Sequence, residues 1–162
     1  MNRKHRLFLE NAIKDPAVVG RYEAKVLRET DHWWWLGALM RSGHGRFWVG
    51  RQDGHDVVVL AHRFGYAVAN GVAVLDAAPV LRHACDEALC QRPQCLIAGE
   101  DNYTNAVEWA TRRHRIGSPL RDTRGRAGRA RAIRSTARAG GDIAAARAAG
   151  MPQVDRDQPT LF

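Results

Sequence analysis

The segment HACDEALCQRPQCLIAGEDNYTN, residues His83 to Asn105, decides how the rest of this chain is interpreted. It contains all three cysteines of the protein, which follow one another at steps of five residues as Cys85, Cys90 and Cys95. Structural zinc takes four ligands in a tetrahedron, usually thiolates and imidazoles. Because three cysteines cannot all pair within one chain, their close spacing favours a metal over a disulfide framework. The segment therefore predicts a zinc site that lacks one ligand. The alternative is that the cysteines are small buried apolar residues.

Short apolar runs flank the cysteines. The run PVLRHA, which Pro79 opens, is too brief for a helix and predicts a strand, and Leu96 with Ile97 predicts a second one. A helix capped by Asn102 or Thr104 follows. These elements are too short to bury a core of their own, so a metal that ties them together would add its binding energy to folding.

The charge of the chain indicates a polyanionic partner. Its 162 residues suffice for one domain, and they give a formal net charge of +8 and a pI near 10.2. Of the 25 basic residues 22 are arginine, which GC-rich coding also favours. Between Arg112 and Arg138, however, ten arginines accompany a single acid, Asp122. Such a regional field is typical of nucleic-acid binding, with an affinity that falls steeply as salt rises.

The sequence has no signal for membrane insertion or secretion. No apolar run reaches the roughly 20 residues that span a bilayer. The basic start MNRKHRLFLE has neither the apolar region nor the cleavage site of a signal peptide. We therefore expect a cytoplasmic protein.

The first half of the chain predicts a helical segment followed by strands. Residues 3–29 have the apolar spacing of a helix that restarts at Asp15-Pro16. Aromatic and β-branched residues with glycines then predict strands and turns, and at least one of the three tryptophans at 33–35 should belong to the core. Residues 61–71 fit either this strand pattern or a helix that ends at Asn70-Gly71.

The last part of the chain predicts two short helices and a tail. An arginine-rich helix spans about 124–139, and an alanine-rich helix capped by Asp142 spans 142–149. The last dozen residues have turn and charge chemistry and are expected to be disordered.

The pattern HACDEALCQRP, followed by an asparagine in a helix, resembles the His-Me finger (HNH-like) endonucleases. The resemblance is to their zinc-stapled branch, which includes the His-Cys box homing endonucleases and phage and actinobacterial HNH proteins. In that branch a Cys-Trp-x-Trp-x-Gly segment supplies the first zinc ligand, and here HWWWLG stands in its place, with His32 instead of the cysteine. The last loop ligand is usually histidine, and here it is Cys95. The resemblance implies a structural zinc with no position left for water, held by His32, Cys85, Cys90 and Cys95.

The resemblance covers residues 32 to about 115 and implies an α+β fold with a ββα-metal core. We expect this zinc-stapled nuclease domain at 30–116, after a helical segment at 1–29. A basic helical extension at 117–150 would contact DNA, and a disordered tail would occupy 151–162.

The same resemblance gives roles to three further residues. His83 matches the general base that takes a proton from the attacking water, which suits an imidazole near neutral pH. Asn105 matches the asparagine whose amide oxygen holds one catalytic Mg²⁺. It lies one residue further from the cysteines than is usual, so Asn102 competes for this role. Arg46 lies on the strand that carries an arginine for the scissile phosphate, and a solvated arginine is the alternative.

The other histidines have weaker assignments. His83 itself has two alternatives, a further zinc ligand or a packed strand residue. His62 lies in AHRFGY, which recurs in the family, and a structural histidine is the favoured interpretation. His44 and His55 lie in glycine-rich turns and receive no role.

The chain ends in QPTLF, which resembles the Gln-x-x-Leu-Phe peptide by which bacterial replication proteins bind the sliding clamp. Gln158 would form a hydrogen bond at the rim of an apolar pocket that accepts Leu161 and Phe162. The alternatives are a chance match and an anchor that docks onto its own domain.

Together these expectations describe a Mg²⁺-dependent DNA endonuclease that uses a histidine-activated water and one catalytic metal, and leaves a 5′-phosphate and a 3′-hydroxyl. The alternative is a catalytically inactive, zinc-stapled module that binds DNA or the sliding clamp. Some relatives dimerise, so a homodimer with two active sites across a duplex is a further option.

Overall fold

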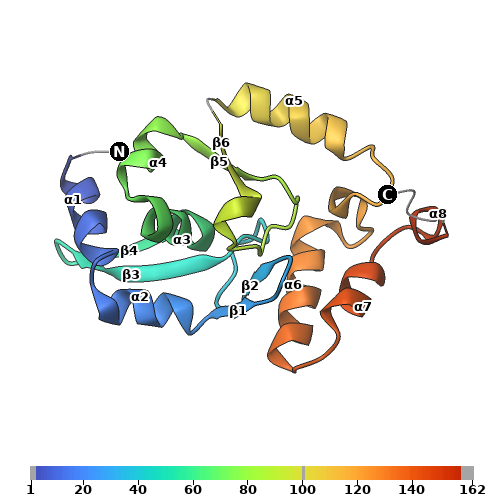
Figure 1. Cartoon of the computed structure of the whole chain (residues 1–162), viewed down its shortest axis with the longest axis horizontal. Coiled ribbons are helices and arrows are strands. Elements are labelled where there is room, and N and C mark those ends of the chain that lie inside the picture. The colour runs from blue at the N-terminus through green and yellow to red at the C-terminus, as the bar shows by residue number, and fades with distance from the viewer. Residues whose placement is uncertain (1–2, 100, 158–162) are drawn as a thin grey trace.

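The strands of this protein form separate pairs and not one continuous sheet. In the computed structural model, which describes residues 3–99 and 101–157, three antiparallel two-stranded sheets are present (Figure 1). They pair β1 (Val26–Arg28) with β2 (Trp33–Trp35), β3 (Arg46–Gln52) with β4 (His55–Leu60), and β5 (Val80–His83) with β6 (Leu96–Gly99). The α-helices of the described residues are α1 (Arg3–Ala12), α2 (Pro16–Glu23), α3 (Ala61–Asn70), α4 (Ala73–Ala77), α5 (Asn102–Arg112), α6 (Gly125–Arg138), α7 (Ile143–Ala148) and α8 (Gln153–Arg156). None of them is long and apolar enough to cross a bilayer.

The N-terminal segment contains two helices and then a strand. Asp15 accepts a hydrogen bond from the amide of Ala17 at 2.8 Å and caps α2, which confirms the predicted restart. Beyond α2 the structure differs from the expected helix, because residues 26–28 form β1. Their apolar side chains are used in pairing with Trp34 and Trp35 of β2, and this long-range pairing outweighs the local helical spacing.

Two of the three tryptophans lie at the centre of the core. Trp34 and Trp35 are fully buried, which confirms that at least one tryptophan belongs to the core. Tyr22 of α2 stacks on Trp35 with ring centroids 5.5 Å apart, and Phe47 of β3 meets Trp35 edge-on at 6.0 Å. The same cluster of buried apolar residues extends from α1 to α7.

Residues 61–70 adopt the helical alternative. Ala61, Phe64 and Ala67 are buried at helical spacing on one face of α3. The helix begins directly after β4 and ends at Gly71, whose φ of 85° favours glycine.

The predicted order of strand, cysteine loop, strand and helix is confirmed. β5 and β6 pair from Val80 opposite Gly99 to His83 opposite Leu96. α5 follows β6, but its cap is Asp101 and not Asn102 or Thr104. The Asp101 carboxylate accepts a hydrogen bond from the amide of Thr104 at 2.7 Å, so a charged acceptor takes the position.

The C-terminal helices α6 and α7 lie side by side, toward the end of the molecule opposite α1 (Figure 1). Asp142 caps α7, as predicted, by accepting a hydrogen bond from the amide of Ala145 at 3.0 Å. Both helices contribute to the core that the N-terminal elements build, α6 through Ala130, Ile133 and Ala137 and α7 through Ile143.

After α7 the structure is more regular than expected. Residues 153–156 form α8, where we expected an irregular chain. Asp155 of this helix explains the difference, because its buried carboxylate accepts a hydrogen bond from Nε of Arg121 at 2.7 Å.

Candidate metal centre and adjoining cavity

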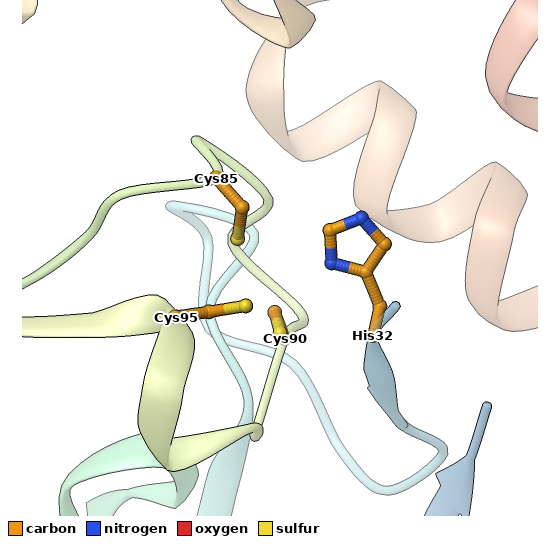
Figure 2. Close-up of side chains that lie close together, drawn as sticks. All are labelled: His32, Cys85, Cys90 and Cys95. Carbon is orange, nitrogen blue, oxygen red and sulfur yellow. The ribbon is translucent and has the colours of Figure 1, made fainter. Parts of the chain in front are cut away.

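Four side chains that could bind a metal ion meet at the loop between β5 and β6 (Figure 2). The ligand atoms of His32, Cys85, Cys90 and Cys95 all lie within 4.8 Å of one another. Figure 2 shows the three sulfur atoms grouped together and the His32 ring facing them. This group is compatible with a structural zinc, because three cysteines and one histidine are an accepted shell for that metal.

Backbone pairing between β2 and the cysteine loop brings the histidine to the cysteines. The amide of Trp35 donates to the carbonyl of Leu89 at 3.1 Å, and the amide of Gln91 donates to the carbonyl of Trp33 at 2.7 Å. Because His32 directly precedes β2, this pairing fixes its position against the loop.

The electrostatics of the group favour a cation. Nδ1 of His32 is buried, and Figure 2 shows it on the side of the ring that faces the sulfurs. A hydrogen bond from the Cys85 thiol lowers the pKa of the Cys90 thiol to about 3, against the effect of burial. The same hydrogen bond and burial raise the pKa of Cys85, and burial raises the pKa of Cys95. A cysteine whose pKa is lowered, next to a buried imidazole nitrogen that faces it, is a suitable start for a metal shell.

A buried ion pair holds the cysteine loop from the other side. Glu87 and Arg129 of α6 are 2% and 5% exposed. The Glu87 carboxylate accepts hydrogen bonds from Nη2 and Nε of Arg129 at 2.6 and 3.0 Å. It also accepts one from Nε of Arg147 of α7 at 3.1 Å. The loop is thus tied to both C-terminal helices.

A cavity of about 350 Å³ adjoins this loop. It lies among β5, α3, α5, α6 and the turn before β3. Its polar lining comprises histidines, asparagines, arginines, an aspartate and a tryptophan. They are His44, His62, His83, Asn102, Asn105, Arg63, Arg82, Arg112, Arg126, Asp86 and Trp109. His83 and Asn105, which the sequence predicted as a site, therefore line one cavity.

His83 is held in a defined orientation at the end of β5. Its Nε2 donates a hydrogen bond to the carbonyl of Cys90 at 2.9 Å. A carbonyl can only accept, so Nε2 carries the proton and Nδ1 keeps the lone pair. Burial lowers the pKa of His83, which favours the neutral ring. His83 does not belong to the metal-binding group, so the alternative of a further zinc ligand is not realised.

Two more histidines line the cavity, although the sequence gave neither of them a role there. The ring centroid of His62 lies 4.6 Å from that of His83, and the ring centroid of His44 lies 5.8 Å from it. His62 is 1% exposed, and its Nδ1 has no hydrogen-bond partner within the described chain. Burial and the charges of His83 and Arg126 lower the pKa of His44 to about 4. The sequence signal for His62 was its place in AHRFGY, which recurs in the family that the chain resembles, whereas His44 carried none.

The predicted Mg²⁺ ligands both reach the cavity, but the predicted phosphate ligand does not line it. Asn102 and Asn105 are three residues apart on α5 and line the cavity together. Arg46 is exposed on β3, opposite Leu60 of β4, and is not among the cavity residues. Gln158, Leu161 and Phe162 lie outside the described residues.

Comparison with known proteins gave no match to a family model, to a curated protein or to a solved structure. The function is therefore argued from the geometry of the two sites.

Proposed function

We propose that this protein is a metal-dependent DNA endonuclease of the His-Me finger type, with a ββα-metal core stapled by one structural zinc. The observation that carries the proposal is the position of His83. It ends β5, and its Nε2–H donates to the carbonyl of Cys90 in the loop between β5 and β6. It shares a cavity with Asn105 of α5 and four arginines. A fixed neutral imidazole, amide oxygens and guanidinium groups are the parts that phosphodiester hydrolysis needs.

The zinc would be structural. His32, Cys85, Cys90 and Cys95 would hold it, and four protein ligands leave no position for water. Binding would join β2 to the loop between β5 and β6, and so stabilise the hydrogen bond that orients His83.

His83 would act as general base through Nδ1. It takes a proton from a water molecule, whose oxygen forms a bond to phosphorus as the bond from phosphorus to the 3′ oxygen breaks in line. The products are a 5′-phosphate and a 3′-hydroxyl. A positioned base contributes about 10²–10⁴-fold to such a rate.

Asn105 would hold the catalytic Mg²⁺ through its amide oxygen, with Asn102 as the competing ligand. A magnesium ion prefers oxygen ligands, keeps most of its water, and when bound here supplies positive charge for the phosphate and the leaving oxygen. Asp86 also lines the cavity, but its carboxylate pairs with Arg112 at 3.0 Å.

DNA is the proposed substrate because the chain carries a net charge of +8. We also propose that the terminal Gln158, Leu161 and Phe162 bind a bacterial sliding clamp, and this proposal is supported by the sequence QPTLF.

The test is nicking of supercoiled plasmid by the pure full-length chain with Mg²⁺ or Mn²⁺. His83→Ala should lower the rate about 10²–10⁴-fold while DNA affinity is kept. His55→Ala is the matched control, because His55 is exposed on β4 and outside the cavity.

Two outcomes would replace the proposal. DNA binding without nicking under either metal indicates a zinc-stapled binding module, and a labelled RNA cut faster than DNA indicates an RNA-directed enzyme.

A further inference from the structure

The cavity beside His83 is lined by four arginines, and the guanidinium groups of three of them bind acceptors within the protein. The acceptors are carbonyl groups or carboxylates of the protein. Arg63 donates to the carbonyls of Ala78 and Pro79, Arg82 pairs with Glu108, and Arg112 pairs with Asp86 and Glu108. These arginines are committed to neighbours within the fold.

Arg126 is different. In the described part of the chain its guanidinium group has neither a hydrogen bond nor an ion pair, although it lines the cavity together with His44 and His83. Its side chain is exposed, so a ligand that enters the cavity can reach it. Its charge is close enough to contribute to the lowered pKa of His44.

The position of Arg126 is fixed by close packing around the first turn of α6. Gly43 has a φ of 89°, and a Cβ atom there would lie 3.0 Å from Cα of Ala127. The turn that carries His44 can therefore approach α6 closely only because residue 43 is glycine. One turn further along α6, Arg129 is anchored on Glu87 at 2.6 Å. The helix therefore presents Arg126 from a rigid base.

Other groups around the cavity also lack an acceptor. Nε1 of Trp109 and Nε of Arg82 are buried N–H donors without a partner among the described residues, and both residues line the cavity. Both atoms are closed to solvent, so Arg126 remains the cavity arginine that a ligand can reach.

We propose that Arg126 is the residue that binds the phosphate of the substrate in this cavity, in place of Arg46. The identity of the anion as a nucleic-acid phosphodiester rests on the proposed function, whereas the anion site itself does not. A guanidinium group can donate two parallel hydrogen bonds to phosphate oxygens and stabilise the charge that builds on them during attack. The basic helix α6 would thus contribute a catalytic residue in addition to its general charge.

The test uses the zinc-loaded full chain and its variant Arg126→Gln in two measurements. The first is the single-turnover rate of plasmid nicking at saturating DNA, which should fall about 10²–10³-fold, as on removal of a charge-stabilising donor in other active sites. The second is binding of inorganic phosphate, followed by Trp fluorescence or by NMR shifts, which should weaken about tenfold or more. Arg126→Lys should recover part of both, because it restores the charge without the planar fork.

Two variants serve as comparison. Arg51→Gln removes an exposed arginine on β3 whose partner is Asp56, and it should change neither measurement. Arg131→Gln removes an exposed arginine of α6 that does not line the cavity, so its effect should be much smaller than that of Arg126→Gln. Unchanged zinc content and melting temperature verify the fold of each variant.

The results separate this inference from the proposed function. Equal effects of Arg126→Gln and Arg131→Gln, or no effect on phosphate binding, overturn the role of Arg126. Loss of nicking in Arg46→Gln with full activity in Arg126→Gln returns the role to Arg46. If the wild-type chain binds phosphate but nicks no DNA, and Arg126→Gln abolishes that binding, the anion site stands and the nuclease function fails.

Discussion

The imidazole of His83 is fixed by one hydrogen bond, from Nε2 to the carbonyl of Cys90. Cys90 is also a member of the metal-binding group, so the residue that would hold the metal and the acceptor that would orient the base are the same residue. A disturbance of the cysteines should therefore reach the cavity through a single backbone carbonyl. A residue outside the metal-binding group and the cavity can also affect the cavity, through the packing of the elements that line it.

Gly43 is such a residue, and its substitution gives a first prediction. Gly43→Ala combines a left-handed backbone, which costs about 1–2 kcal/mol for an L side chain, with crowding against α6, which costs about 1–3 kcal/mol. The free energy of unfolding measured in urea should fall by the sum. Nicking should fall as well, because the clash displaces the first turn of α6, which carries Arg126.

Gly54→Ala is the matched control for this prediction. Gly54 has a φ of 81° but nothing within 4 Å of a Cβ atom. It should show the backbone cost of about 1–2 kcal/mol without loss of nicking. Equal losses of stability in the two variants would contradict the close approach of the His44 turn to α6.

At the scale of elements, α6 uses several of its arginines within the fold. Arg129 is buried against Glu87, and Arg134 donates to the carbonyl of Gly37 at 3.1 Å. Asp122 is buried in the same network. Burial alone raises its pKa, but hydrogen bonds from Arg124 and Arg129 hold the pKa of this carboxyl below its usual range. Some arginines of α6 therefore stabilise the fold through ion pairs and hydrogen bonds within the protein.

The second prediction concerns the ion pair between α6 and the cysteine loop. Glu87→Gln keeps the shape of the side chain but removes the charge that faces Arg129 and Arg147. Breaking a buried pair by changing one partner costs about 3–5 kcal/mol. The free energy of unfolding in urea should fall by this amount, and zinc affinity should fall with it because the loop is less ordered.

Glu10→Gln is the surface control, because Glu10 pairs with Arg6 at 2.8 Å in a partly exposed position. It should lose about 0–1 kcal/mol. A loss for Glu87→Gln no larger than this would mean that the loop does not depend on α6.

The order of elements around the cysteines was predictable, and the neighbours of α6 were not. Short apolar runs beside Pro79 and at Leu96 predicted β5 and β6, because runs of that length fit strands alone. Glu87 lies far from Arg129 in the sequence, so no local sequence pattern predicts the ion pair between them. The strand at 26–28 was missed for the same reason, since its partner Trp34 determines its conformation.

For the whole molecule, the candidate metal-binding group joins segments that are far apart in the sequence. His32 directly precedes β2, and the cysteines come from the loop between β5 and β6. The residue types and spacing predicted the three cysteines of this group, and the resemblance to the His-Me finger endonucleases supplied His32 as the fourth member. The cavity was predicted only in part. His83 and Asn105 had a recognisable pattern, whereas His44, His62 and Arg126 reach it from turns and helices that only the tertiary fold brings together.

The third prediction is the effect of metal removal. Metal analysis should find about one zinc per chain, and His32→Ala should lose most of it. Chelation should lower the melting temperature and abolish nicking, because metal binding contributes directly to folding. Mg²⁺ alone should not restore activity, and zinc followed by Mg²⁺ should.

His55→Ala serves again as the control and should keep its zinc. If chelated protein melts at the same temperature and recovers full nicking with Mg²⁺ alone, the four-residue group has no structural role.

The Glu87 carboxylate accepts hydrogen bonds from arginines of α6 and α7. This pairing determines whether residues 1–112, which contain the cysteines, can fold without the C-terminal helices. A fragment that ends after α5 would leave Glu87 without Arg129 and Arg147. We therefore expect it not to fold independently. A chimera with a foreign C-terminal half would need an arginine at each of the two docking points. Substitutions on α6 and α7 that leave the fold intact should therefore spare Arg129 and Arg147, which hold the cysteine loop through Glu87.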